Sequence, residues 1–164
     1  MSGYPSDVSV YTKILPANAS GILPIGSAVA MLLTTNSRAW KPYPPGNVKL
    51  NGLAYSAWPT NTTGNVTLSW SPRSRTLQGI GTTLVPQDNT GTGLAQEGTV
   101  TVKAYVNGVL KRTWAGLTGT SQVYTLAQRT ADDADLNKPV TFTITPINGA
   151  YTGTVRTTPA FVMG

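Results

Sequence analysis

The sequence predicts an all-β protein whose main part is an antiparallel β-sandwich, and two observations support this prediction. Short runs of alternating apolar and polar residues recur in the second half of the 164-residue chain, with turn residues between them. Only 11% of the residues are charged, while Thr, Gly, Pro, Asn and Ser are abundant, which favours short strands over helices. A chain of this length has room for one ordinary domain and a smaller unit.

Residues 1–40 are expected to form that smaller unit, a strand-rich N-terminal arm. Residues 8–15 and 26–35 are apolar-rich, are separated by turn residues, and are both predicted to be strands. An isolated two-stranded unit is marginally stable in water, so its apolar side chains are expected to contact another subunit. The residues predicted at this interface are Val8, Val10, Tyr11, Ile14, Val29 and Met31, together with Trp40 and Tyr43.

Residues 41–46 are predicted to be a linker, because three prolines in six residues favour an extended path and cannot continue a helix or a central strand. Trp40 and Tyr43 flank these prolines. They could dock the linker against the sandwich or make an external contact, and both alternatives are open at this stage.

Residues 47–164 show the sandwich pattern. Val66, Leu68 and Trp70 alternate with polar residues, and a similar run at residues 100–106 ends in Asn-Gly, the dipeptide most suited to a tight hairpin turn. Further strands are predicted at residues 109–114, 122–126, 140–144 and 154–162, with a turn at the acidic residues between 132 and 135. The predicted core, placed on the inward face of three adjoining strands, comprises Trp70, Val102, Phe142 and Ile144.

Residues 72–98 interrupt this pattern, since they contain few apolar residues and exceed the length of an ordinary hairpin loop. The segment is either an insertion without a role or a loop that contacts a partner. In the second case Arg73 and Arg75 are the candidate contact residues.

The composition argues against an enzyme. There is no histidine, the commonest general base and metal ligand, and of the six carboxylates only Asp88 and Glu97 could face each other as a hydrolytic pair. No phosphate-binding or nucleophile motif is present, so no cofactor is expected. Asp132, Asp133 and Asp135 could bind calcium, although a solvated turn is favoured because the spacing lacks the glycine and glutamate of a dedicated loop.

Charge and hydropathy limit the partners further. The net charge is +6, but the basic residues are scattered, so a solvated surface is favoured over a nucleic-acid site. The longest apolar run is far shorter than the roughly 20 residues of a membrane span. The N-terminus makes a poor secretory signal, and the lack of cysteine suits folding in a reducing cytoplasm.

The order of residues 45–50, 66–70, 100–106, 124–126 and 140–149 resembles a fibronectin type III domain, in which Trp70 matches the buried tryptophan of the second strand. The family's penultimate strand usually opens with a tyrosine, and Val140 stands there instead. The resemblance covers roughly residues 45–162 and implies an immunoglobulin-like sandwich.

A narrower stretch, residues 37–48 followed by 68–75, is similar to tail hub proteins of long-tailed phages, which are several times longer. This resemblance implies a structural virion protein of the tail tip or baseplate, assembled in the bacterial cytoplasm. Its partners would be other tail proteins and further copies of itself, as a ring or trimer around the tail axis, with a host-surface glycan or receptor as an additional partner. The alternative is a secreted carbohydrate-binding or adhesin module.

Overall fold

The computed structural model describes residues 9–18, 21–22, 24–34, 40–74 and 95–164. The chain divides into two compact units, Met1–Trp40 and Lys41–Gly164, which we describe separately.

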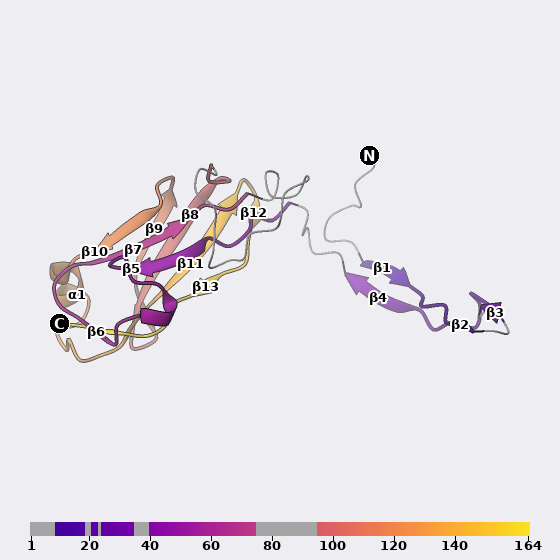
Figure 1. Cartoon of the computed structure of the whole chain (residues 1–164), viewed down its shortest axis with the longest axis horizontal. Coiled ribbons are helices and arrows are strands. Elements are labelled where there is room, and N and C mark those ends of the chain that lie inside the picture. Colours follow the sequence, from indigo (N-terminus) through magenta and orange to yellow (C-terminus); the bar gives the residue numbers. More distant parts are fainter. Residues whose placement is uncertain (1–8, 19–20, 23, 35–39, 75–94) are drawn as a thin grey trace. The chain divides into compact units, whose positions relative to one another are not determined.

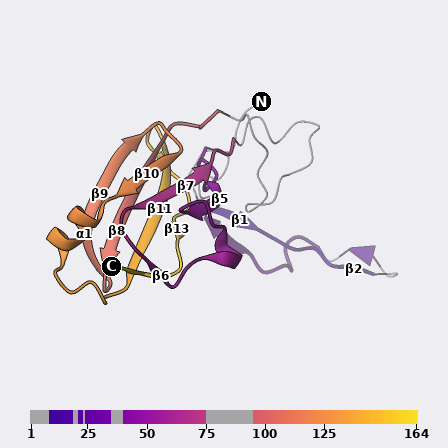
Figure 2. The ribbon, with the colours of Figure 1, turned by 60° about the vertical axis from the view of Figure 1, so that its left-hand side comes forward.

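The second unit is a sandwich of two antiparallel sheets (Figures 1 and 2). One sheet has the order β10-β7-β5, and the other has the order β12-β11-β8-β9 with β13 also paired to β11. The prediction of a mainly β protein with an antiparallel β-sandwich is therefore confirmed. The strands are β5 (Gly46–Leu50), β7 (Val66–Ser71), β8 (Thr99–Val106), β9 (Val109–Leu117), β10 (Ser121–Tyr124), β11 (Val140–Asn148), β12 (Tyr151–Thr152) and β13 (Arg156–Thr157).

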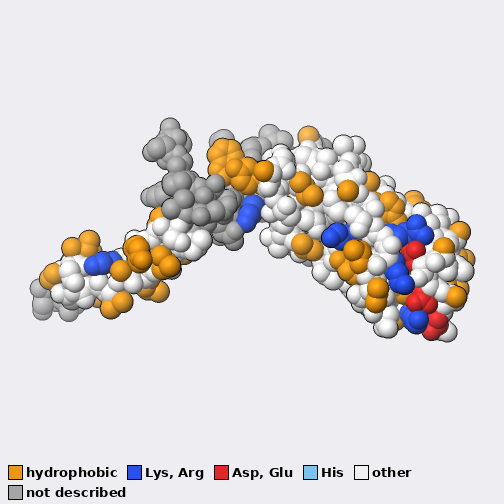
Figure 3. Space-filling view, turned by 180° about the vertical axis from the view of Figure 1, so that it is seen from behind, with side chains coloured by type: hydrophobic (Ala, Val, Ile, Leu, Met, Phe, Trp, Pro, Cys, Tyr) orange, Lys and Arg blue, Asp and Glu red, His pale blue; other side chains and the backbone are white. Residues whose placement is uncertain are grey.

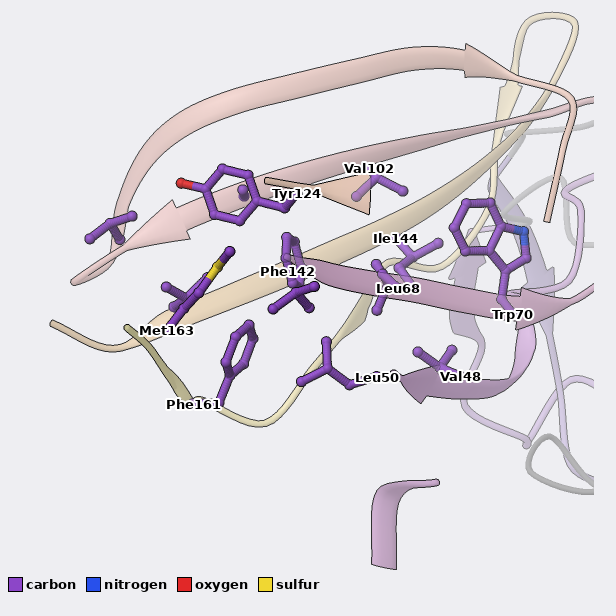
Figure 4. Packing of buried hydrophobic residues seen from close by; sticks show 14 of the residues in the cluster. Val48, Leu50, Leu68, Trp70, Val102, Tyr124, Phe142, Ile144, Phe161 and Met163 are labelled. Atoms are coloured by element: carbon purple, nitrogen blue, oxygen red, sulfur yellow. The ribbon is translucent and has the colours of Figure 1, made fainter. Parts of the chain in front are cut away.

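The core lies between the two sheets, because β5, β7 and β11 alternate buried and partly exposed side chains. Trp70, Val102, Phe142 and Ile144 are all buried, and Figure 4 shows them with Leu68 in one cluster. Their strands do not all adjoin, however, which corrects the predicted arrangement. Trp70 lies on β7 of one sheet, whereas β8 and β11 pair in the opposite sheet, so these residues meet across the sandwich.

Short elements complete this unit. A 3-10 helix, η1 (Tyr55–Ala57), precedes β6 (Asn61–Thr62), which pairs in parallel with β14 (Val162–Met163) near the end of the chain. The side chains of Phe161 and Met163 are buried in the core beside Phe142 (Figure 4).

The predicted strand at residues 122–126 is wrong at its end, because an α-helix, α1 (Leu126–Asp132), begins there. Thr125 caps the helix by accepting a hydrogen bond from the Gln128 backbone N–H, while the Gln128 side chain accepts one from the Thr125 N–H. This reciprocal pair satisfies two N–H groups that would otherwise be without partners. The acidic residues predicted as a turn therefore begin inside a helix.

The proline segment is not a free linker, which corrects the predicted boundary. Pro42, Pro45 and Gly46 are buried, and Gly46 is already the first residue of β5. A methyl group added at Gly153 would lie only 2.2 Å from the Pro42 carbonyl oxygen, so the prolines pack closely on the chain that follows β12. Residues 41–46 belong to the sandwich.

The first unit is a narrow ribbon. Its strands β1 (Ser9–Thr12) and β4 (Met31–Thr34) pair antiparallel, and a second hairpin joins β2 (Ala17–Asn18) to β3 (Gly21–Ile22). Both regions expected to be strands contain one, but each strand is only four residues long. Across the part of the chain that the structure describes, no helix has the length and apolar character needed to cross a bilayer.

Candidate assembly site in the N-terminal arm

The register of β1 and β4 determines which side chains share a face of the arm. Tyr11 lies opposite Leu32, and Val10 lies opposite Leu33. Because neighbouring residues of a strand point to opposite faces, these two pairs lie on opposite faces of the ribbon. The Thr12–Met31 pair shares the face of Val10 and Leu33, and the Ser9–Thr34 pair shares the face of Tyr11 and Leu32. Each face therefore presents at least one apolar cross-strand pair.

Most large apolar side chains of the arm are exposed. Val29 has 82% of its surface accessible and Tyr11 has 76%, values typical of charged surface residues rather than of a core. Figure 3 shows this unit with hydrophobic side chains spread over its visible surface. The exposed set comprises Tyr11, Ile14, Leu15, Ile22, Ile25, Val29, Met31, Leu32 and Leu33.

Of the predicted interface residues, Val10 is partly buried and Val8 lies outside the described residues. Ile14, Val29 and Met31 are exposed, as an interface requires. Ala28 is the one buried hydrophobic residue among those described in the arm. A two-stranded ribbon has no second layer against which to pack, so it cannot bury such side chains alone.

Charge is scarce in the arm. Its residues 1–40 include only Asp7, Lys13 and Arg38 as charged residues, and the Lys13 ammonium donates a hydrogen bond to the Ile25 carbonyl oxygen at 2.7 Å. That contact bridges two loops of the ribbon. The described surface of the arm is thus rich in apolar side chains and nearly uncharged.

The remaining interface candidates lie in different units. Trp40 is the last residue of the arm unit and is half exposed, whereas Tyr43 belongs to the sandwich. The Arg73 guanidinium carbon lies 5.1 Å from the centre of the Tyr43 ring, a cation–π distance. Tyr43 and Arg73 therefore contact each other within the sandwich unit.

The base of the predicted loop 72–98 is held in place, while residues 75–94, with Arg75 and Asp88, lie outside the described residues. The Trp70 indole donates to the Gln96 side-chain oxygen at 3.3 Å, and the Gln96 amide donates to the Leu117 carbonyl oxygen at 2.9 Å. Glu97 accepts a hydrogen bond from the Asn148 amide at 3.0 Å. Glu97 is thus engaged in a structural contact.

The acidic residues 132–135 also serve structural contacts. Asp132 accepts hydrogen bonds from the Arg112 guanidinium and the Tyr124 hydroxyl, both at 2.7 Å. The pKa of Tyr124 is raised, mainly because its hydroxyl is buried and secondly because it donates a hydrogen bond to Asp132. Lys138 binds Asp133 at 2.9 Å and holds the pKa of that carboxyl below its usual value. Figure 3 shows acidic and basic side chains together at this end of the sandwich.

These carboxylates do not form a metal site in the part of the chain that is described, where no group of three potential ligands comes together. The residue that sequence reasoning missed is Arg129, which is fully buried and donates to the backbone carbonyls of Asp133, Asp135 and Lys138. The Thr125–Gln128 spacing was the available signal, since it is a helix-start pattern that would have placed Arg129 in a helix.

A glycan-binding module stacks sugar rings on open aromatic side chains, but Tyr55, Trp58 and Trp114 are engaged within the sandwich. Arg156 lies 4.5 Å over the Tyr55 ring, and the Tyr55 hydroxyl donates to the Thr157 carbonyl oxygen at 2.9 Å. The Trp58 ring lies 5.2 Å from that of Tyr55, and Trp114 packs edge-on against Tyr124. None of these rings is among the exposed large hydrophobic side chains.

No family model matches the chain, and no curated protein matches it. Among solved structures, it is similar to domains d3–d4 of the extracellular region of rat CD45. The identity is 10%, the TM-score is 0.45, and the match covers 99% of this chain and 67% of that one.

Proposed function

We propose that this chain is a structural virion protein of a phage tail tip or baseplate, attached through its N-terminal arm. The observation that carries the proposal is the arm's exposed apolar surface, which a two-stranded ribbon cannot bury alone. The likeness of residues 37–48 and 68–75 to tail hub proteins supports the choice of particle. In this proposal the sandwich braces or decorates the tail end, and contact with a host-surface glycan or receptor is a further role.

Two properties of the chain support a structural rather than a catalytic role, and a third disfavours the rival binding module. Its described carboxylates at 97, 132 and 133 are occupied by side-chain hydrogen bonds or ion pairs. The sequence contains no histidine. The rival secreted glycan-binding module would need an open aromatic platform, and the rings of Tyr55 and Trp58 pack against each other instead.

The particle itself provides the test. Virions produced from the genome that encodes this chain are purified and analysed by mass spectrometry, and antibody labelling locates the chain by electron microscopy. We expect the chain at the tail end, and we expect Tyr11→Asp with Val29→Asp to remove it from particles, because buried unpaired charges are strongly unfavourable. Val109→Asp, at an exposed position of the sandwich, is the matched control and should be incorporated normally.

Absence of the wild-type chain from purified virions would contradict the proposal. Recovery of the free chain from culture medium, with binding to a panel of immobilised glycans, would favour the secreted module instead.

A further inference from the structure

We infer that the arm binds arms of other copies of this chain, with each ribbon packed between two others so that both of its faces are covered. This inference deepens the proposed function, on which it rests, by naming the partner of the arm. The partner is a second and a third copy of the same chain.

The two-sided character of the ribbon is the first argument. A hairpin that lies on the surface of one partner needs an apolar face toward the partner and a polar face toward water. Here the Tyr11–Leu32 pair lies on one face and the Val10–Leu33 pair on the other, while Tyr11, Leu32 and Leu33 are more than half exposed. One covering layer would leave the opposite apolar face in water.

The size of the ribbon is the second argument. A stable interface buries roughly 800 Å² per partner. Each face of the four-residue strands offers only one apolar cross-strand pair. A contact through a single face is therefore weak, and each ribbon gains stability from contacts on both of its faces.

Charge is the third argument. Residues 1–40 have a net charge of +1, from Lys13 and Arg38 against Asp7, whereas residues 41–164 carry +5 of the total of +6. Identical arms can therefore stack with little like-charge repulsion. A charged partner would find almost no complementary charge on the described ribbon, where Lys13 is bound to the Ile25 carbonyl oxygen.

The two faces differ in shape, which indicates how the copies are arranged. One face carries the aromatic ring of Tyr11, and the other carries the aliphatic side chains of Val10, Met31 and Leu33. Packing the first face of one copy on the second face of the next is a heterologous contact, and such contacts generate a ring or an open stack rather than a closed dimer. The assembly therefore contains at least three copies.

Two full-length variants test this arrangement, each made polar on one face with residues that keep strand propensity. Tyr11→Thr with Leu32→Thr blocks the first face, and Val10→Thr with Leu33→Thr blocks the second. Masses are measured by sedimentation equilibrium over a concentration series. The control is Val109→Thr with Leu110→Thr, at exposed positions of β9 in the sandwich. Near-ultraviolet circular dichroism verifies that each sandwich is folded.

The wild-type chain and the control should have masses of three copies or more, and each blocked variant alone should be monomeric. An equimolar mixture of the two blocked variants should form only weak dimers with one copy of each, detected at the highest concentrations, because each variant retains the face that the other lacks and one face-to-face contact remains. A monomeric wild type, or blocked variants that keep the wild-type mass, would overturn the inference. So would homodimers of a blocked variant, or binding to phosphatidylcholine vesicles by a wild type that does not self-associate.

The outcomes separate this inference from the proposed function. A chain that self-associates through its arm but is absent from virions leaves the inference standing and contradicts the tail-tip role. A chain that is monomeric in solution but enters virions through its arm supports the tail-tip role and overturns self-association.

Discussion

The guanidinium of Arg129 donates a hydrogen bond of 2.6 Å to the backbone carbonyl oxygen of Asp133, directly after the end of helix α1. The same side chain also reaches the carbonyls of Asp135 and Lys138, so one buried cation organises the connection from α1 to β11. A planar guanidinium suits this role because its donors point in fixed, separate directions.

Replacing this side chain should destabilise the sandwich strongly. Arg129→Met should lower the free energy of unfolding by about 2 to 4 kcal/mol, because three carbonyls lose a buried donor. Urea denaturation followed by tryptophan fluorescence measures the loss. Arg129→Lys should recover only a small part of it, since a single ammonium cannot reproduce the fork. Full recovery by lysine would show that the charge, rather than the geometry, matters.

The capping box of α1 should contribute separately. Thr125→Ala removes the acceptor for the Gln128 N–H and should cost about 1 kcal/mol. Thr130→Ala is a suitable control, because this exposed hydroxyl only donates back to the Leu126 carbonyl oxygen within the helix. Equal losses for both variants, measured by urea midpoint, would contradict a specific role for the cap.

Trp70 should be the most sensitive of the four core positions that the sequence predicts. Trp70→Ala should cost about 3 to 5 kcal/mol, because it removes a large buried side chain between the two sheets. Val109→Ala, at an exposed position, should change the urea midpoint very little. A loss below about 1 kcal/mol for the tryptophan variant would contradict the packing across the sandwich.

The parts of the fold that the sequence predicted are those governed by local rules. Residues 66–70 and 100–106 alternate because each strand has one face in the core, and the burial pattern follows that alternation except at Thr101, which is also buried. Asn107 and Gly108 both adopt positive φ, of 49° and 77°, as the hairpin turn requires. In these segments the residue types of a few neighbouring positions determine the backbone conformation directly.

The predictions that failed depend on contacts between distant residues. Arginine is normally exposed, so nothing local indicated that Arg129 would be buried beneath the acidic segment. The prolines at 42–45 have the composition of a linker, yet their position is decided by contact with Gly153, more than 100 residues later. The excess of apolar residues in the arm was visible in the sequence, but the division between its two faces needed the strand register.

The ion pair between Asp133 and Lys138 predicts a pH dependence. The pKa of Asp133 is lower in the folded state, so its stabilising effect is complete above the unfolded value of about 3.9 and is lost as pH falls through the lower folded value. Asp133→Asn should therefore narrow the difference in urea midpoint between pH 6 and pH 3. High salt should shrink this effect, because the pair lies near the surface. An unchanged acid dependence in the variant would show that other carboxyls account for it.

The packing of the proline segment on the sandwich can be tested at Gly153. An added methyl group there would lie 2.2 Å from the Pro42 carbonyl oxygen and 2.7 Å from the Pro146 ring, and neither neighbour is a flexible chain end. Gly153→Ala should therefore cost about 1 to 3 kcal/mol, as overpacking does, and should increase amide exchange at Tyr43. Gly119→Ala is the matched control, because nothing lies within 4 Å of its added methyl group, and its stability should stay within about 0.5 kcal/mol of wild type. If Gly153→Ala behaves like this control and proteolysis cuts the native chain within residues 41–46, these residues are a free linker and the sandwich begins only at β5.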